Sequence, residues 1–208
     1  FAIDIGTSAV ARMVGPLTGG VLLQMIGAEA AFFTQAVTFV FAMLIIASLH
    51  YTPPLRVGPP ASAITELFEG LRYLRARQLL IGGILVSFLM NLFGFPYTSM
   101  VPVIGKETLG VDPLGVGMLQ SAEGLGALIG ATLIATLAPT RIYARMYVLG
   151  TGLFLIMVTA FSGSTTYTLS FALLFIAGFG MAAYTSMQVT LMVAGSAPAM
   201  RGRVMGAV

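Results

Sequence analysis

Two ionisable side chains lie deep inside apolar stretches of this sequence, where a charge is costly. Arg12 lies ten residues along the apolar stretch 2–26, and Glu123 lies nine residues into the stretch 114–138. At 1.5 Å per helical residue, each reaches about 13–15 Å into a hydrocarbon layer about 30 Å thick. An unpaired charge at that depth costs at least about 2.5 kcal/mol. Because the two stretches run antiparallel if the chain weaves, the two charges are expected at similar depth.

This shared depth suggests a proton-carrying role for Glu123. We expect Arg12 and Glu123 to meet in one conformation and to separate in another. A carboxyl that loses its positive partner takes up a proton more readily, so Glu123 is a candidate proton carrier. Two alternatives stay open, namely a permanent structural pair and a Glu123 that faces a cavity alone.

Four uncharged polar residues in the apolar stretches are further candidates for the substrate pathway: Asn91, Gln120, Tyr184 and Gln188. Tyr184 and Gln188 are four residues apart, so they share one face of a helix. Asn91 is followed by Gly94, Pro96 and Pro102, which predicts a bent or broken helix of the kind that lines transport sites. Each of the four could instead make an interhelical hydrogen bond worth about 0.6 kcal/mol.

The decapeptide ARMVGPLTGG, residues 11–20, places small residues and a proline around Arg12. Small residues four apart let another helix approach closely, and a proline bends its own helix. Small residues lie on one face of this helix, and Pro16 and Gly20 form the adjacent row. A second pair of glycines begins about one turn after Glu123. The expected interface residues are Ala11, Gly15, Pro16, Gly19, Gly20, Gly126 and Gly130. Ordinary small-residue packing is the alternative.

The elements that must position these residues are membrane-length helices. Apolar residues make up 58% of the chain and charged residues 8%, against about 25% in a soluble domain, and the mean hydropathy is +0.98. Six apolar stretches are long enough to cross a bilayer, and they lack the alternation of a membrane barrel. They are 2–26, 30–50, 79–104, 114–138, 146–162 and 167–194. The predicted fold is therefore an all-α membrane protein, a polytopic helical bundle.

The gaps between the stretches predict the orientation. If the six stretches weave, the segments 51–78, 139–145 and 195–203 share one side, and together they hold eight arginines. The segments 27–29, 105–113 and 163–166 lie on the other side, where Lys106 is the only basic residue. Basic loops stay in the cytoplasm, so this first side is expected to be cytoplasmic. The segment 51–78 begins with the stiff stretch TPPLRVGPP, and an amphipathic helix capped by Ser62 is expected to follow it.

The composition disfavours several other classes of function. The chain has no cysteine and one histidine, so we expect no metal site, no cofactor and no catalytic cluster. The net charge of +3 is small and scattered, which disfavours nucleic-acid binding. An intramembrane enzyme and a non-transporting membrane subunit remain the alternatives to a transporter. Neither end of the sequence resembles a natural terminus, and we expect a fragment with a further span starting after Arg203.

Three motifs resemble one known family. GPLTGG inside a span is similar to the signature of the fifth helix of major facilitator superfamily exporters. GMLQSAEGLGALIGATL resembles the eighth helix of that family, and APAMRGRV resembles its loop between the tenth and eleventh helices. The closest resemblance is to the enterobactin-exporter-like, transmembrane secretion effector branch. The resemblance spans helices five to ten and the start of the eleventh.

The resemblance implies a twelve-helix transporter made of two six-helix halves that rock about a central cavity. Residues 1–50 would be the last two helices of the N-terminal half, 51–78 the cytoplasmic linker, and 79–208 four helices of the C-terminal half with the start of a fifth. The fifth and eighth helices would face each other across the interface between the halves. The implied function is proton-coupled export of a small drug-like or siderophore-like molecule, as an antiporter. The full-length protein is expected to be a monomer in the cytoplasmic membrane.

Overall fold

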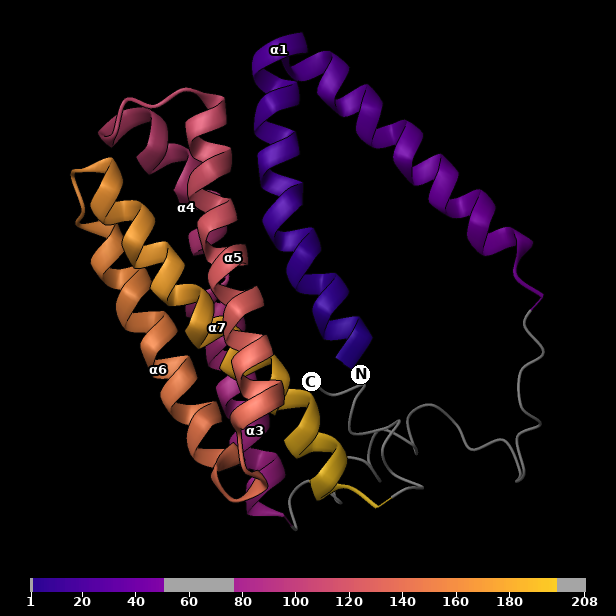
Figure 1. The fold of residues 1–208 in the computed structure, drawn as a ribbon, viewed down its shortest axis with the longest axis vertical. Helices are drawn as coiled ribbons and strands as arrows, with labels where there is room; N and C mark the ends of the chain where they lie inside the picture. Colours follow the sequence, from indigo (N-terminus) through magenta and orange to yellow (C-terminus); the bar gives the residue numbers. More distant parts are fainter. Residues whose placement is uncertain (1, 51–76, 198–208) are drawn as a thin grey trace.

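The first long helix is divided by a single glycine. A computed structural model describes residues 2–50 and 77–197, and its first element is α1 (Ala2–Ser48). Gly27 has φ 79° and ψ 174°, a conformation that L-residues with a side chain rarely adopt. The chain therefore bends there, and Figure 1 shows the two arms of α1 meeting at an acute angle. The predicted stretches 2–26 and 30–50 correspond to these two arms.

The next span is interrupted twice, as its glycine and prolines predicted. It consists of α3 (Gln78–Leu89), the π-helical turn η1 (Met90–Gly94), α4 (Tyr97–Val103) and the π-helical turn η2 (Ile104–Thr108). The amide of Phe95 donates to the carbonyl of Met90 over 2.8 Å, which is the wider hydrogen bond of a π-turn. Such turns insert an extra residue into a helix and mark functional sites in many proteins.

Three further helices complete the described fold. They are α5 (Pro113–Leu137), α6 (Tyr143–Ser162) and α7 (Tyr167–Gly195), with the short turn η3 (Thr140–Ile142) before α6. Asp112 caps α5, because its Oδ1 accepts a 2.7 Å hydrogen bond from the amide of Gly115, and Pro113 occupies the first helical position. No strand occurs among residues 2–50 and 77–197, so the predicted all-α fold is confirmed.

The helices pack in a fixed order around α5 and α7. The first arm of α1 lies along one side of α5, α7 lies along the other, and α6 covers α7 (Figure 1). Glycines allow α5, α6 and α7 to approach closely: a Cβ added at Gly178 would meet the backbone of α5, and one at Gly180 would meet α6. The second arm of α1 diverges from this bundle, and Phe32 on it is 76% exposed.

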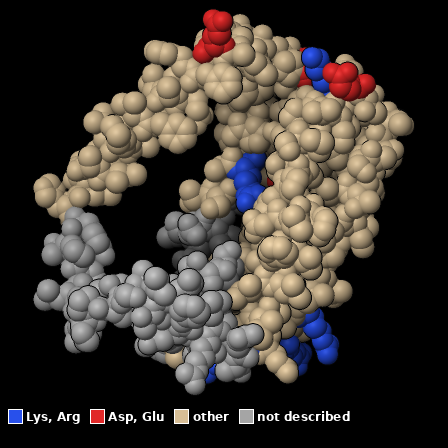
Figure 2. All heavy atoms as spheres, turned by 180° about the vertical axis from the view of Figure 1, so that it is seen from behind, with Lys and Arg blue, Asp and Glu red and all other residues tan. Residues whose placement is uncertain are grey.

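The dimensions and charges of the bundle fit a membrane. Five helices are long and apolar enough to cross a bilayer, and the first of these, Val10–Ser48, contains the bend at Gly27. With both arms counted, the described chain is a multi-pass membrane protein. Figure 1 places the bend of α1, the start of α5 and the turn between α6 and α7 at one end. Figure 2 shows acidic side chains gathered at that upper end together with a basic one, and further basic side chains midway and at the lower end.

Two of the predicted features lie outside the residues that the structure describes. They are the amphipathic helix expected after Ser62 and the further span expected after Arg203. The described basic residues Arg77, Arg141 and Arg145 lie at the opposite helix ends from Lys106, as the weave predicted. Which end faces the cytoplasm stays a prediction.

Candidate interface site between α1 and α5

The closest contact between α1 and α5 is made by backbone atoms. A Cβ added at Gly117 would lie 2.5 Å from the carbonyl oxygen of Pro16, and one at Gly124 would lie 2.5 Å from the amide nitrogen of Met13. On the other helix, a Cβ at Gly20 would lie 2.7 Å from the carbonyl oxygen of Pro113. All three distances are shorter than ordinary Cβ contacts, so only glycine fits at these positions without a shift of the helices.

Of the residues of α1 that were expected at an interface, Pro16 and Gly20 lie against α5. A Cβ at Gly15 or Gly19 would have no neighbour within 4 Å among the described residues, and Ala11 is exposed. The contact is made instead by the adjacent row that holds Pro16 and Gly20. Successive helical residues point about 100° apart, so a shift of one residue selects a different neighbour.

Gly126 and Gly130, which follow Glu123, lie at the contact between α5 and α7. Gly126 approaches the carbonyl of Phe175 on α7, and Gly130 approaches Ala182 on the same helix. They therefore pack α5 against α7 rather than against α1. The glycines of α5 that do face α1 are Gly117 and Gly124, two turns apart, and the sequence reasoning missed both.

Glu123 precedes Gly124 on α5 and is 5% exposed. Gly124, the next residue, lies directly against the backbone of Arg12, and the positive charge of Arg12 acts on the Glu123 carboxyl. However, no Arg12 nitrogen lies within 4.0 Å of a Glu123 oxygen, which is the distance that defines an ion pair. Arg12 itself is exposed. The two charges therefore act on each other, but they are not in ion-pair contact.

Tyr97 is a residue that acts on this carboxyl and that the sequence reasoning missed. Its hydroxyl and the Glu123 carboxyl act on each other electrostatically, while Oε1 of Glu123 is buried without a hydrogen-bond partner in the described chain. The Tyr97 ring packs edge-on against the Phe154 ring, with ring centroids 5.3 Å apart, and this contact helps to position Tyr97. The sequence shows a tyrosine directly after Pro96, but no spacing along the chain predicts that this tyrosine lies near a residue of α5.

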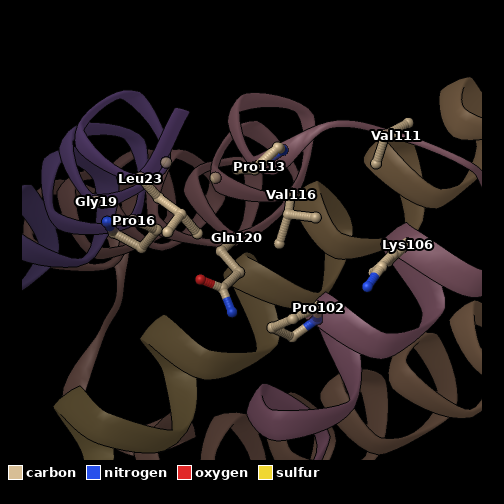
Figure 3. Close-up of a pocket in the computed structure, with 11 residues that line it drawn as sticks. Pro16, Gly19, Leu23, Pro102, Lys106, Val111, Pro113, Val116 and Gln120 are labelled. Atoms are coloured by element: carbon tan, nitrogen blue, oxygen red, sulfur yellow. The ribbon is translucent and has the colours of Figure 1, made fainter. Parts of the chain in front are cut away.

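Gln120 lies one turn from Glu123 and lines a cavity of about 620 Å³ between α1, α4, η2 and α5. Its amide donates a 3.3 Å hydrogen bond to the carbonyl of Thr98. Figure 3 shows Gln120 between Pro16 and Gly19 on one side and Pro102 and Lys106 on the other. Most of the lining is apolar: Pro16, Gly19, Gly20, Leu23, Pro102, Val111, Pro113, Val116 and Gly117. Gln120 therefore reaches a cavity, as one reading of the sequence expected.

Tyr184 and Gln188 share a face of α7, as predicted, but they join a buried polar cluster rather than this cavity. Gln188 Nε2 donates to Ser87 Oγ over 2.7 Å, and the Tyr147 hydroxyl donates to the carbonyl of Gly83 over 3.1 Å. Tyr147 stacks on Tyr184 with ring centroids 5.6 Å apart. Tyr184 is 2% exposed. The cluster thus connects α3, α6 and α7, and sequence reasoning missed Ser87 and Tyr147.

Asn91 is not brought to the other candidates by side-chain contact. It lies in η1, is exposed, and donates a 2.9 Å hydrogen bond to the carbonyl of Ser87 in its own helix. In the part of the chain that the structure describes, no three His, Cys, Asp or Glu side chains are placed to hold a metal ion.

Comparison with known proteins identifies the family. A profile described as Major Facilitator Superfamily matches residues 1–208. The chain belongs to this superfamily. It is 25% identical over 149 residues to the "Staphyloferrin A transporter" of Staphylococcus aureus (strain NCTC 8325 / PS 47), which covers 70% of this chain and 36% of that protein. It is 28% identical over 137 residues to the "Uncharacterized MFS-type transporter YdgK" of Bacillus subtilis (strain 168), which covers 64% of this chain and 34% of that protein.

Superfamily membership places the described helices in a larger architecture. The matches span about a third of the length of each relative, and no solved structure matches. The family and the names of its relatives indicate a membrane transporter rather than an enzyme. The resemblance stated from the sequence motifs is therefore confirmed at the level of the superfamily.

Proposed function

We propose that the complete protein is a proton-coupled exporter of a small organic molecule, in which Glu123 carries the proton. The observation that supports this most directly is a carboxyl at membrane depth, 5% exposed, with one oxygen that lacks a hydrogen-bond partner in the described chain. An ionisable group at that depth is costly, and such a residue is therefore a candidate for a functional role. Because Glu123 precedes Gly124, which packs against the backbone of Arg12 and Met13, and because the Arg12 charge acts on the Glu123 carboxyl, its protonation state can influence the helix contact.

The position of Arg12 supports a switch at this contact. If residues 1–50 belong to the N-terminal half of the transporter and 79–208 to the C-terminal half, then α1 and α5 meet across the interface between the halves. The Arg12 charge acts on Glu123 without an ion pair within 4.0 Å. A small relative movement of the helices would close or widen this gap. In this proposal a protonated Glu123 releases Arg12 and lets the halves separate, and a charged Glu123 holds them together.

Similarity and the cavity both support a small organic substrate. One relative is named as a transporter of staphyloferrin A, which supports a small drug-like or siderophore-like substrate. The 620 Å³ cavity beside the interface is of the size that holds drug-sized ligands, about 300–1,000 Å³. We also propose that the complete protein is a monomer in the cytoplasmic membrane, with 51–78, 139–145 and 195–203 on the cytoplasmic side.

Flux in proteoliposomes that contain the complete transporter tests the role of Glu123. The comparison uses wild type, Glu123→Gln and Glu123→Asp, with an imposed proton gradient. We expect Glu123→Gln to abolish proton-driven substrate movement while retaining slow exchange down a substrate gradient, and Glu123→Asp to retain coupling. Full proton-driven transport in Glu123→Gln would show that this carboxyl carries no proton.

A charge exchange tests the pairing with Arg12 separately. Arg12→Glu and Glu123→Arg should each inactivate transport, because each places two like charges at the same depth. Recovery of transport in the double variant would support an alternating contact between the two positions. If the double variant is inactive although it is inserted normally, a pairing between these two charges has no role in transport.

A further inference from the structure

The cavity between α1 and α5 contains one unpaired cation. Lys106, in η2, is the only charged residue among the eleven that line the cavity. No hydrogen bond or ion pair connects its ammonium to another residue in the described part of the chain. Figure 3 shows the Lys106 amine directed toward Pro102, on the far side of the cavity from Pro16 and Gly19. The cavity therefore combines an apolar wall with one exposed positive group.

The nearby acidic groups form no ion pair within 4.0 Å with this cation in the described part of the chain. The carboxylate of Asp112 is held by neutral donors, because its Oδ1 accepts from the amide of Gly115 and its Oδ2 accepts a 2.9 Å hydrogen bond from Gln24. Glu107 follows Lys106 in the chain but does not line the cavity. Glu123 lies deeper, beside Tyr97, and does not line it either.

The remaining polar group of the cavity is a neutral amide rather than a competing charge. One N–H of the Gln120 amide donates to the carbonyl of Thr98, which leaves its second N–H and its side-chain oxygen at the cavity wall. A ligand that fits would present an anionic group to Lys106, a hydrogen-bonding group to Gln120, and an apolar body to the proline, glycine, valine and leucine residues of the lining.

We propose that this cavity binds an amphipathic organic anion, with Lys106 holding its anionic group. This inference rests on the proposed transport function, and it adds to it the charge class of the substrate. The Lys106 ammonium has no partner among the described residues, so it gains a charge-assisted hydrogen bond when a carboxylate or sulfonate enters, at little cost in desolvation because the lysine is exposed. A cationic substrate would meet repulsion at the same position.

Equilibrium binding to two probes that differ in head-group charge tests this proposal. Dansylglycine carries a carboxylate and dansylcadaverine an ammonium on the same fluorophore. Fluorescence titrations use the complete transporter in phosphatidylcholine nanodiscs, with empty nanodiscs as background. Wild type should bind dansylglycine more tightly than dansylcadaverine. Lys106→Gln should weaken dansylglycine binding about tenfold, as expected for one lost charge-assisted hydrogen bond, and should not weaken dansylcadaverine binding.

Three variants make the result specific. Lys106→Arg should retain the preference for the anion, Lys106→Glu should reverse it, and Arg141→Gln, at the other end of the bundle, should leave it unchanged. A wild type without preference for dansylglycine, or an unchanged preference in Lys106→Glu, would overturn the proposal. Because binding is measured without a proton gradient, loss of coupling in Glu123→Gln would not alter these titrations. Failure of the charge preference and failure of proton coupling are therefore separate results.

Discussion

The side-chain amide of Gln120 donates to the main-chain oxygen of Thr98 across 3.3 Å, and so connects α5 to α4. Residue 102 would donate to that same oxygen in an unbroken α-helix, but Pro102 has no N–H. The polar side chain of one helix thus serves a carbonyl that a proline in another helix cannot. This gives Gln120 a structural role at the wall of the cavity, beside any contact with substrate.

A double-mutant cycle on Gln120 and Pro102 measures this role. Gln120→Leu should lower the free energy of unfolding by about 0.6–1.5 kcal/mol, because the Thr98 oxygen loses its donor from α5. In a Pro102→Ala background, the amide of residue 102 can donate to Thr98, so the same substitution should cost less. The measurement is reversible unfolding in mixed detergent. Equal costs in both backgrounds would show that Pro102 and Gln120 do not share this carbonyl.

Glycine at position 124 should control how often α1 and α5 are in contact. Gly124→Ala places a methyl group 2.5 Å from the Met13 nitrogen, and overpacking of this kind costs about 1–3 kcal/mol. The conformation with the helices together should therefore lose population by about tenfold or more. The chain has no native cysteine, so spin labels on cysteines at Val14 and Met118 can report the distance between the helices.

The control for this variant is Gly152→Ala on α6. A Cβ at Gly152 meets nothing within 4 Å, so the added methyl should only improve helix propensity. The distance distribution between the two labels should match that of the labelled wild type. A distribution for Gly124→Ala that is indistinguishable from the control would contradict the close contact described here.

The polar cluster around Ser87 should stabilise the packing of α3 against α6 and α7. Ser87 Oγ accepts from Gln188 and lies 3.3 Å from the Tyr147 hydroxyl, so Ser87→Ala leaves buried polar groups with fewer partners. We expect a loss of about 1–3 kcal/mol in the free energy of unfolding. Ser162→Ala is the matched control, because Ser162 is exposed and bonds only to the carbonyl of Thr159 in its own helix.

Gln188→Leu in the Ser87→Ala background completes this test. If the two side chains stabilise the protein through one shared hydrogen bond, the second substitution should cost less in the variant than in wild type. Additive costs, or an effect of Ser162→Ala as large as that of Ser87→Ala, would contradict a specific cluster.

The identity of the elements could be predicted because it depends on local chemistry. Unbroken apolar stretches must form helices in a membrane, since the backbone has no water to bond to, and this gave the spans and their boundaries to within a few residues. Gly94, Pro96 and Pro102 predicted the interrupted span for a similarly local reason. The depth of Arg12 and Glu123 also followed from counting residues along a helix of fixed rise.

The neighbours of each helix face could be settled only by the tertiary structure. Gly15 and Pro16 are adjacent in the chain but point about 100° apart on the helix. Nothing in the sequence indicates which of these two directions faces α5. For the same reason, Gly117 and Gly124 were missed as partners of α1, and Tyr97 was missed as a neighbour of Glu123. Composition and periodicity determine that a residue lies inside the membrane, whereas the rotation and packing of whole helices decide which side chains meet there.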